Sequence, residues 1–348
     1  MPERKRRTSS RPTIRDVAAS AEVSVQTVSN LINGRFEQMS DATRGRVEDV
    51  MKQLGYHPDV GARGLRSSRT RTLGFLVLDE HMAFLADPLT GLLIAGIGDV
   101  ARECDFGILV RGARPSAREG DLLKPIRERR IDGAFVLLSG PPKIRRALIE
   151  SLAETGVDFV IFDEITDASS ILSVRAADRD GGRRLTEHIL SRGHRRIAFA
   201  AAQVPWPVIE QRFLGYRDAL ASAGIEPDPQ LELFESGWAP VGGAEMARTL
   251  LALPDAPTAI ICGSDLLAIA AMRAIRDAGL RIPEDVGVAG FDDFAFAEYV
   301  EPPLTTVAVP GYEMGKAAAT MLIDQLEGHG PAVRHVVFGV ELKTRGSV

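Results

Sequence analysis

From Leu73 onward the chain alternates between short apolar runs and amphipathic segments, and this alternation constrains the fold more than any other feature. The apolar runs are TLGFLVL, FGILV, GAFVLL, DFVIF, RIAFAA, TAIIC and VGVAGF. The amphipathic segments cover residues 91–104, 116–130, 142–155, 179–192, 209–223, 240–252, 265–279 and 311–327. Continuous apolar runs that alternate with helices are typical of buried parallel strands. The pattern therefore predicts a parallel α/β fold.

There are too many elements for one modest sheet, so we expect two lobes. The pattern is weak through EITDASS, residues 164–170, and we expect the chain to pass between the lobes there. Ligands of parallel sheets bind beyond the carboxyl ends of the strands. The loops after the apolar runs are therefore the predicted place for a binding site.

Residues 13–56 carry a different pattern, with three short helices. Thr13 and Ser24 are suitable N-caps for helices at about residues 14–20 and 25–32. Ser40 is suited to begin a third helix, which would run to Leu54 and end at Gly55. Three helices of this length have little core of their own, and such a module usually presents a surface.

The second of these helices has two unlike faces. The inward face is predicted to hold the apolar side chains Val28, Leu31 and Ile32. The outward face is predicted to hold Val25, Gln26, Ser29 and Asn30. An amide such as that of Gln26 can pair with the donor and the acceptor of an adenine edge, and Val25 can contact a thymine methyl group. The alternative interpretation is a plain solvated helix.

The charge is divided unevenly along the chain. Residues 1–71 hold 14 Lys and Arg against 8 Asp and Glu, a net charge of +6, and residues 72–348 have a net charge of −11. Opposite signs on neighbouring domains indicate that the first domain meets a polyanion. The alternative is that RKRR, residues 4–7, is only a solvated tail.

Cysteine usage and hydropathy indicate the compartment. Cys104 and Cys262 lie far apart without metal-like spacing, so we predict no disulfide framework, no metal and no cofactor. The chain has no run of about 18 apolar residues and no apolar segment behind its basic start, so secretion and membrane spanning are disfavoured. We expect a cytoplasmic protein.

The segments TIRDVAASAEVSVQTVSNLING, MSDATRGRVEDVMKQLGYHPD and ARGLRSSRTRTLGFLV resemble the N-terminal helix-turn-helix and hinge of the lactose/galactose repressor family of bacterial transcription regulators. The resemblance continues through IDGAFVL, GHRRIAFAA, QRFLGYRDALASAGI, IICGSDLLAIAAMRAIRDAGLRIPEDVGVAGFDD and PPLTTV. It implies an all-α helix-turn-helix headpiece joined to a two-lobed, periplasmic-binding-protein-like α/β domain with parallel sheets.

The resemblance also implies boundaries and partners. Residues 1–12 would be a basic tail, 13–58 the DNA-binding domain, 59–71 the hinge, and 72–348 the effector-binding and dimerisation domain. Such a chain would be a homodimeric, nucleoid-associated repressor rather than an enzyme. It would bind a pseudo-palindromic double-stranded operator, and a small effector, a sugar or related metabolite, would control that binding by changing lobe closure.

Site residues follow from the same resemblance. Base-reading positions fall on Val25, Gln26 and Asn30. Phosphate-contacting positions fall on Ser24, Thr27 and Asn33, and Thr13 is a further DNA-binding position. The hinge would contribute Ala62, Arg63 and the minor-groove wedge Leu65. Effector-binding positions fall on Pro88, Thr90, Asp163, Arg212, Trp238, Ser264 and Asp292, with Asp178 near the cleft. Taken singly, the carboxylates could instead be helix caps, Arg212 a surface ion-pair partner and Trp238 ordinary packing.

The sequence departs from the family pattern in several places. Glu22 stands where a glycine is common in the turn between helices, and Asn30 where an arginine is common. Asp59 replaces a frequent Asn beside the hinge. Asp87-Pro88-Leu89-Thr90 lacks the usual two aromatics, and Ser264-Asp265 replaces Asn-Asp. We therefore expect a pocket with less apolar contact and a more polar character.

Two other classes of protein fit the α/β pattern. A Rossmann enzyme would need a GxGxxG, GxxxxGKS/T or GxSxG motif, and the sequence has none after an expected strand. His188 and His194 are expected to be solvated or structural. A transport-type solute-binding protein would need an export signal, and the basic helical module would then have no purpose.

Overall fold

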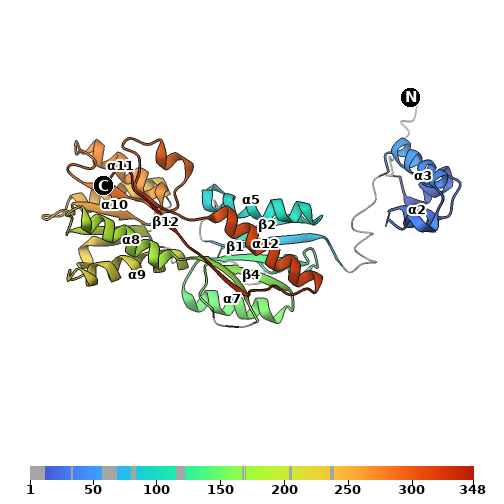
Figure 1. Ribbon diagram of the computed structural model, residues 1–348, viewed down its shortest axis with the longest axis horizontal. Helices are drawn as coiled ribbons and strands as arrows, with labels where there is room; N and C mark the ends of the chain where they lie inside the picture. The colour runs from blue at the N-terminus through green and yellow to red at the C-terminus, as the bar shows by residue number, and fades with distance from the viewer. Residues whose placement is uncertain are drawn as a thin grey trace, which may run out of the picture. The chain divides into compact units, whose positions relative to one another are not determined.

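The computed structural model describes residues 12–32, 34–56, 69–79, 84–114, 122–166, 168, 170–203, 206–235 and 239–348. The chain forms two compact units that divide between Thr70 and Arg71. The first unit is helical, and the second consists of two parallel α/β lobes (Figure 1).

The first unit has the predicted helices. They are α1 (Ile14–Ser20), α2 (Val25–Ile32) and α3 (Asp41–Leu54), with the 3-10 turn η1 (Phe36–Gln38) before α3. Their small core consists of Val17, Ala18, Ala21, Val28, Leu31 and Val47. Glu22 in the turn between α1 and α2 has a φ of 53°. The turn is therefore left-handed at Glu22 without a glycine, at a cost of roughly 1–2 kcal/mol.

The first lobe of the second unit contains a six-stranded parallel sheet in the order β11-β5-β4-β3-β1-β2. Its strands are β1 (Thr72–Leu78), β2 (Gly107–Ala113), β3 (Gly133–Leu138), β4 (Asp158–Phe162), β5 (Leu172–Ala176) and β11 (His335–Phe338). Successive side chains alternate between faces. Phe75 and Val77 pack under α5 (Pro88–Glu103) and α12 (Gly311–Glu327), whereas Leu76 and Leu78 pack against α6 (Lys124–Arg127) and α7 (Pro142–Glu154).

The second lobe contains a four-stranded parallel sheet in the order β7-β6-β8-β9. Its strands are β6 (Ile197–Ala202), β7 (Glu232–Glu235), β8 (Ala259–Cys262) and β9 (Gly287–Ala289). One face packs on α8 (Asp178–Ser191) and α9 (Pro207–Ser222), and the other on α10 (Ala239–Leu251) and α11 (Asp265–Asp277). A short antiparallel pair, β10 (Thr306–Ala308) and β12 (Glu341–Lys343), lies beside α8. The remaining 3-10 turns are η2 (Phe84–Ala86), η4 (Pro229–Leu231) and η5 (Ala295–Glu298).

The expectation that residues 164–170 pass between the lobes is wrong. This segment joins β4 to β5, which are neighbours in the first sheet. The chain instead changes lobe between β5 and α8, between β10 and α12, and between β11 and β12. The sequence pattern did not predict β5, because LSVRA is short and mixed in polarity. Its outer neighbour β11 also comes from the far end of the chain. Of the helix predicted over residues 116–130, the described part is helical only at Lys124–Arg127.

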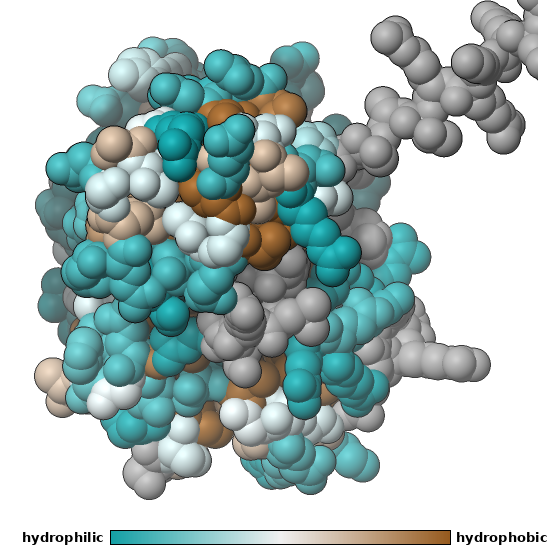
Figure 2. Space-filling model, turned by 90° about the vertical axis from the view of Figure 1, so that its right-hand side faces the viewer, coloured by the Kyte–Doolittle hydropathy of each residue, from teal (hydrophilic) through white to brown (hydrophobic). Residues whose placement is uncertain are grey.

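On the face shown in Figure 2, hydrophilic side chains predominate and apolar side chains form only small patches. Within the described ranges, every helix is too short or too polar to cross a bilayer.

Helices α8 and α9 pack at backbone distance because glycines face each other's helix. A Cβ atom on Gly182 of α8 would lie 2.2 Å from the carbonyl oxygen of Arg212, and one on Gly215 of α9 would lie 2.1 Å from that of Arg179. This close approach sets the position of Arg212 relative to the first turn of α8.

We predict that Gly182→Ala forces α8 and α9 apart and lowers the free energy of unfolding by roughly 1–3 kcal/mol, because added volume in a packed interface costs about that much. Gly91→Ala is the matched control, because Gly91 is helical and nothing lies within 4 Å of its added Cβ. The control should be neutral or stabilising by up to about 1 kcal/mol. Urea denaturation measures both, and equal effects would contradict the packing argument.

Candidate functional site

The first unit exposes the start of α2. Val25 is 43% exposed, and Gln26 is also exposed. Ser24 caps the helix, since its Oγ accepts from the Thr27 amide at 3.0 Å and lies 2.9 Å from Thr27 Oγ1. Val25 and Gln26 are therefore exposed in the first turn of a helix whose start is stabilised by an N-cap.

The outward position predicted for Ser29 and Asn30 is wrong. Their exposed fractions are 8% and 7%. Gln26 Nε2 donates to Asn30 Oδ1 at 3.0 Å, and Asn30 Nδ2 donates to Gln38 Oε1 at 2.7 Å. Helical periodicity could not reveal this burial, because it depends on how η1 packs against α2.

The other residues predicted for this surface divide into two groups. Thr13 is exposed and caps α1, with its Oγ1 and amide both donating to Asp16 Oδ2 at 2.8 and 2.7 Å. Asn33, Ala62, Arg63 and Leu65 lie outside the described residues.

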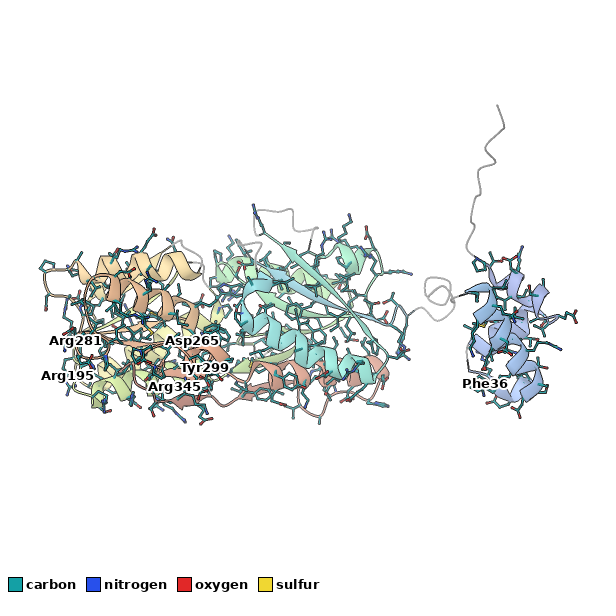
Figure 3. The ribbon with its side chains drawn as sticks, turned by 90° about the horizontal axis from the view of Figure 1, so that it is seen from above. Phe36, Arg195, Asp265, Arg281, Tyr299 and Arg345 are labelled. Atoms are coloured by element: carbon teal, nitrogen blue, oxygen red, sulfur yellow. The ribbon has the colours of Figure 1, made fainter. Side chains whose placement is uncertain are left out.

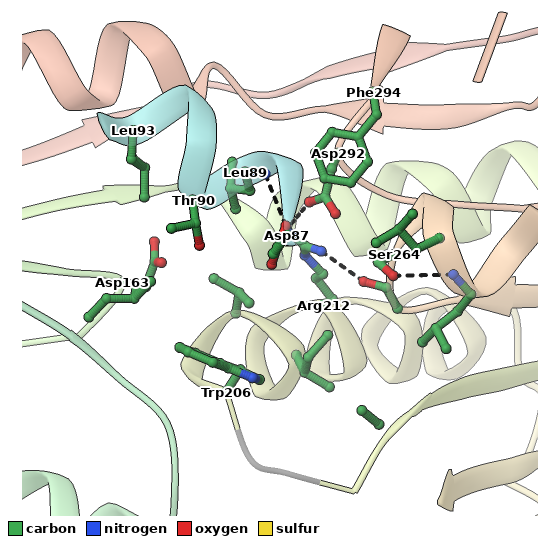
Figure 4. Close-up of a pocket in the computed structure, with 17 residues that line it drawn as sticks. Asp87, Leu89, Thr90, Leu93, Asp163, Trp206, Arg212, Ser264, Asp292 and Phe294 are labelled. Atoms are coloured by element: carbon green, nitrogen blue, oxygen red, sulfur yellow. Dashed lines mark hydrogen bonds and ion pairs between the residues drawn. The ribbon is translucent and has the colours of Figure 1, made fainter. Parts of the chain in front are cut away.

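The second unit contains a cleft of about 790 Å³, part of it open to solvent, at the carboxyl ends of the strands (Figure 4). Leu137 is the second-last residue of β3, Asp163 follows β4, and Ala202 ends β6. Gly263 and Asp292 come from the loops after β8 and β9. The site therefore lies where the strand pattern predicted it.

Arg212 of α9 is the central cation of the cleft. Its Nε donates to Asp178 Oδ1 at 2.8 Å, its Nη2 to Asp292 Oδ1 at 2.7 Å, and its Nη1 to the Gly263 carbonyl at 2.8 Å. The guanidinium also lies 4.0 Å from the ring centre of Phe291. Burial opposes its charge, but the two carboxylates outweigh that effect and raise the pKa of Arg212. These bonds leave two of its five N–H donors for a ligand.

Three carboxyl groups line the cleft with raised pKa values. Burial raises the pKa of Asp292 to about 6, although Arg212 opposes this shift. Burial also raises the pKa of Asp163 well above its usual range, and the nearby carboxyl group of Asp178 adds to the shift. The pKa of Asp87, the N-cap of α5, is raised mainly by burial. Such groups can donate as well as accept hydrogen bonds, which suits hydroxyl groups.

The expectation of a more polar pocket is wrong. Most of the wall is apolar, and its side chains are Leu89, Leu93, Leu137, Ala202, Trp206, Val208, Ile209, Leu266, Leu267 and Phe294. Leu89 and Thr90 stand at the two positions where aromatics are usual, and Trp206 supplies an indole from the N-cap of α9. Sequence reasoning missed Trp206, although it follows the RIAFAA strand, in a loop where ligands were expected.

Most of the predicted effector residues meet in the cleft. Thr90, Asp163, Arg212, Ser264 and Asp292 line it. Pro88 does not line it but starts α5 between Asp87 and Leu89, which do. Asp178 is not a lining residue and holds Arg212 in place, and Trp238 lies outside the described residues.

An ion-pair cluster joins the two lobes beside the cleft. Arg145 of α7 is 5% exposed and pairs with Glu164, which follows Asp163. Its Nη1 also donates to the Gly140 carbonyl at 2.6 Å and to Oε1 of Glu210 on α9 at 3.2 Å. The contact with Glu210 joins α7 of the first lobe to α9 of the second.

Asp265 is fully buried in the second lobe (Figure 3) and fixes one wall of the cleft. Its Oδ1 accepts from Thr306 Oγ1 at 2.6 Å and its Oδ2 from the Phe294 amide at 2.9 Å. Burial raises the pKa of Asp265 to about 8, and the nearby carboxylate of Asp292 adds to the shift.

Comparisons with known proteins relate both units to one group of regulators. Residues 13–59 match the family model "Bacterial regulatory proteins, lacI family", and residues 186–348 match "Periplasmic binding protein-like domain". The HTH-type transcriptional regulator CelR of Thermobifida fusca is 34% identical over 341 residues, which are 97% of this chain and 98% of that protein.

Two solved structures are similar over almost the whole chain. A transcriptional regulator CelR–cellobiose complex is 33% identical with a TM-score of 0.73, covering 97% of this chain and 100% of that one. The lac repressor dimer bound to operator and the anti-inducer ONPF is 27% identical with a TM-score of 0.82, covering 97% and 99%.

We predict that Asp265→Asn removes a pH-dependent loss of stability. Folded Asp265 keeps its proton up to about pH 8, whereas the unfolded group loses it near its ordinary value of 3.8, so the wild type loses stability as the pH rises between these values. Asparagine can donate to Thr306 and accept from Phe294 without charging. Urea unfolding should show the variant's relative stability growing by up to about 1.4 kcal/mol per pH unit and levelling off above pH 8. A difference independent of pH would contradict the burial argument.

We predict that Glu210→Ala loosens the closed arrangement of the lobes, because it removes the ion pair between Glu210 of the second lobe and Arg145 of the first. Small-angle scattering of the ligand-free protein should give a larger radius of gyration for the variant than for the wild type. Glu187→Ala is the matched control, because it removes an exposed pair with Arg183 inside α8. The same radius for Glu210→Ala and the wild type would show that this ion pair does not hold the lobes together.

Proposed function

The chain belongs to the lacI family of bacterial regulatory proteins, and we propose that two copies of it bind one pseudo-palindromic operator under the control of a neutral sugar. Membership makes the chain a DNA-binding transcriptional repressor with a periplasmic-binding-protein-like effector domain, and not an enzyme. The operator contacts, the dimer and the sugar are proposals. The composition of the cleft is the observation that supports the sugar.

The operator-binding surface consists of the start of α2 together with the segment beyond α3. Val25 and Gln26 are exposed at this end and contact base edges in the major groove. Ser24, Thr27 and Thr13 contact phosphates, as does Asn33, which lies outside the described residues. Ala62, Arg63 and Leu65, also outside the described residues, contact the minor groove, with Leu65 as a wedge between base pairs.

Two copies are needed because one short helix reads too few base pairs. In a symmetric dimer the two α2 helices reach half-sites about one turn of DNA apart, roughly 34 Å. The lac repressor structure, which is a dimer bound to operator, supports this arrangement for a similar chain.

The cleft favours a neutral ligand rich in hydroxyl groups. Its described lining has three carboxyl groups, from Asp87, Asp163 and Asp292, against the single guanidinium of Arg212. Arg212 is already paired with Asp178 and Asp292, so an anionic ligand would meet carboxylates without a free countercharge. Trp206 offers a flat apolar surface for the face of a sugar ring. The similar CelR structure is a complex with cellobiose, and we propose a sugar of this neutral class here.

Control of operator binding requires the sugar to bind one arrangement of the lobes more tightly than the other. Lining residues come from both lobes, with Asp163 following β4 of the first and Arg212 on α9 of the second. A ligand that contacts both therefore changes the population of the closed lobes. The dimer transmits this change to the spacing and order of the two hinges.

The full-length protein should bind a promoter fragment from its own chromosome with a steep dependence on salt. In a fluorescence anisotropy assay, one neutral mono- or disaccharide from a panel that includes cellobiose should shift the midpoint, whereas sugar phosphates should not. Trp206→Ala should abolish the sugar effect and keep the midpoint measured without sugar. A response to sugar phosphates, or an unchanged response in Trp206→Ala, would contradict the proposed effector class.

A further inference from the structure

Three amide side chains form a chain of hydrogen bonds from α2 to the turn that follows it. Gln26 Nε2 donates to Asn30 Oδ1 at 3.0 Å, and Asn30 Nδ2 donates to Gln38 Oε1 at 2.7 Å. We propose that Gln38 is a specificity-determining positioning residue. It fixes the amide of Gln26 through Asn30 without touching a base. The inference rests on the proposed function, in which Gln26 reads a base edge.

Asn30 is placed to position rather than to read. It is 7% exposed, and both heteroatoms of its side-chain amide have partners within the same unit. Its backbone carbonyl also accepts from the Arg35 amide at 2.9 Å, which holds the chain beyond α2 against the helix. To pair with a base, Asn30 would have to become exposed and break its hydrogen bonds with Gln26 and Gln38. Gln38 Oε1 would then lose the hydrogen bond from Asn30, which costs free energy.

Gln38 is itself held in place, because the turn η1 that carries it is fixed. The Met39 amide donates to the Phe36 carbonyl at 3.1 Å and closes the turn. The Arg44 guanidinium of α3 lies 4.1 Å from the ring centre of Phe36, which is labelled in Figure 3, and Arg44 pairs with Glu48 at 2.9 Å. Contacts with α3 therefore hold the turn on one side, and the amide chain joins it to α2 on the other.

This arrangement prepares Gln26 for an adenine edge. One Nε2 hydrogen is used by Asn30, which leaves the other hydrogen and Oε1 as the donor and acceptor that adenine requires. Gln26 is exposed and would otherwise sample many rotamers. Fixing such a side chain before binding is worth roughly a 2- to 12-fold gain in affinity. The gain applies only to the base that matches the fixed amide, so it appears as selectivity.

The experiment measures the base preference of the full-length protein at every position of a half-site, using a randomised operator library and a nonspecific duplex as reference. The variants are Gln26→Ala, Asn30→Ala, Gln38→Ala, Gln38→Glu and the double variant Gln26→Ala/Gln38→Ala. Glu37→Ala, in the same turn and exposed, is the matched control. Gln38→Glu is the conservative variant, because a carboxylate still accepts from Asn30 Nδ2.

Gln38→Ala and Asn30→Ala should weaken the preference by about 2- to 12-fold at the base pair that Gln26→Ala affects. Affinity for the nonspecific duplex should not change. The double variant should lose no more base preference than Gln26→Ala alone. Gln38→Glu and Glu37→Ala should keep the wild-type preference.

Two outcomes would overturn the inference and leave the base reading by Gln26 intact. One is that Gln38→Ala weakens binding to all sequences equally, as a merely structural role predicts. The other is that Asn30→Ala relaxes a different base pair, which would make Asn30 a base reader itself. If Gln26→Ala relaxes no base pair, the proposed role of α2 fails, and the inference fails with it.

Discussion

The buried contact of Arg212 with Asp178 and Asp292 is the interaction on which the second unit depends. Arg212 is 2% exposed, and a lone charge so deeply buried would be costly, so its two carboxylates and the Gly263 carbonyl must be in place. Gly182 and Gly215 make this possible by letting α8 and α9 meet at their backbones. A packing feature of two helices thereby fixes the centre of the cleft.

The same contact sets the chemistry that the cleft can offer. Asp178 and Asp292 neutralise Arg212, and we therefore propose that the other carboxyl groups and the apolar wall select a ligand that is neutral and carries hydroxyl groups. The two lobes share the core cluster that contains both Phe162 and Phe291, and the ion pair of the buried Arg145 with Glu210 also joins them. The shared core and the ion pair therefore both hold the lobes together, and the proposed ligand would act on the same arrangement.

Local patterns predicted the elements well and their long-range arrangement poorly. The bounds of α1 and α2, and the strands from β1 to β9 with clear apolar runs, follow from caps and periodicity. The short strand β5 and its neighbour β11 at the edge of the sheet did not, because their pairing joins segments that are far apart in the sequence. Family resemblance predicted Asp163, Arg212 and Asp292, and all three line the cleft. Burial of Asn30 and the indole of Trp206 depend on how loops fold back, which periodicity does not contain.

The central proposal is that ligand binding in the cleft built around Arg212 controls the affinity of the first unit for DNA. The most direct test is the operator dissociation constant of the wild type and of Arg212→Lys, each with and without the saturating neutral sugar that stabilises the wild type. Sugar should change the operator dissociation constant of the wild type by about 5- to 150-fold, as is typical of allosteric coupling. Arg212→Lys should bind the operator normally without sugar, and its dissociation constant should not respond to sugar. An equal change in both proteins would contradict the account.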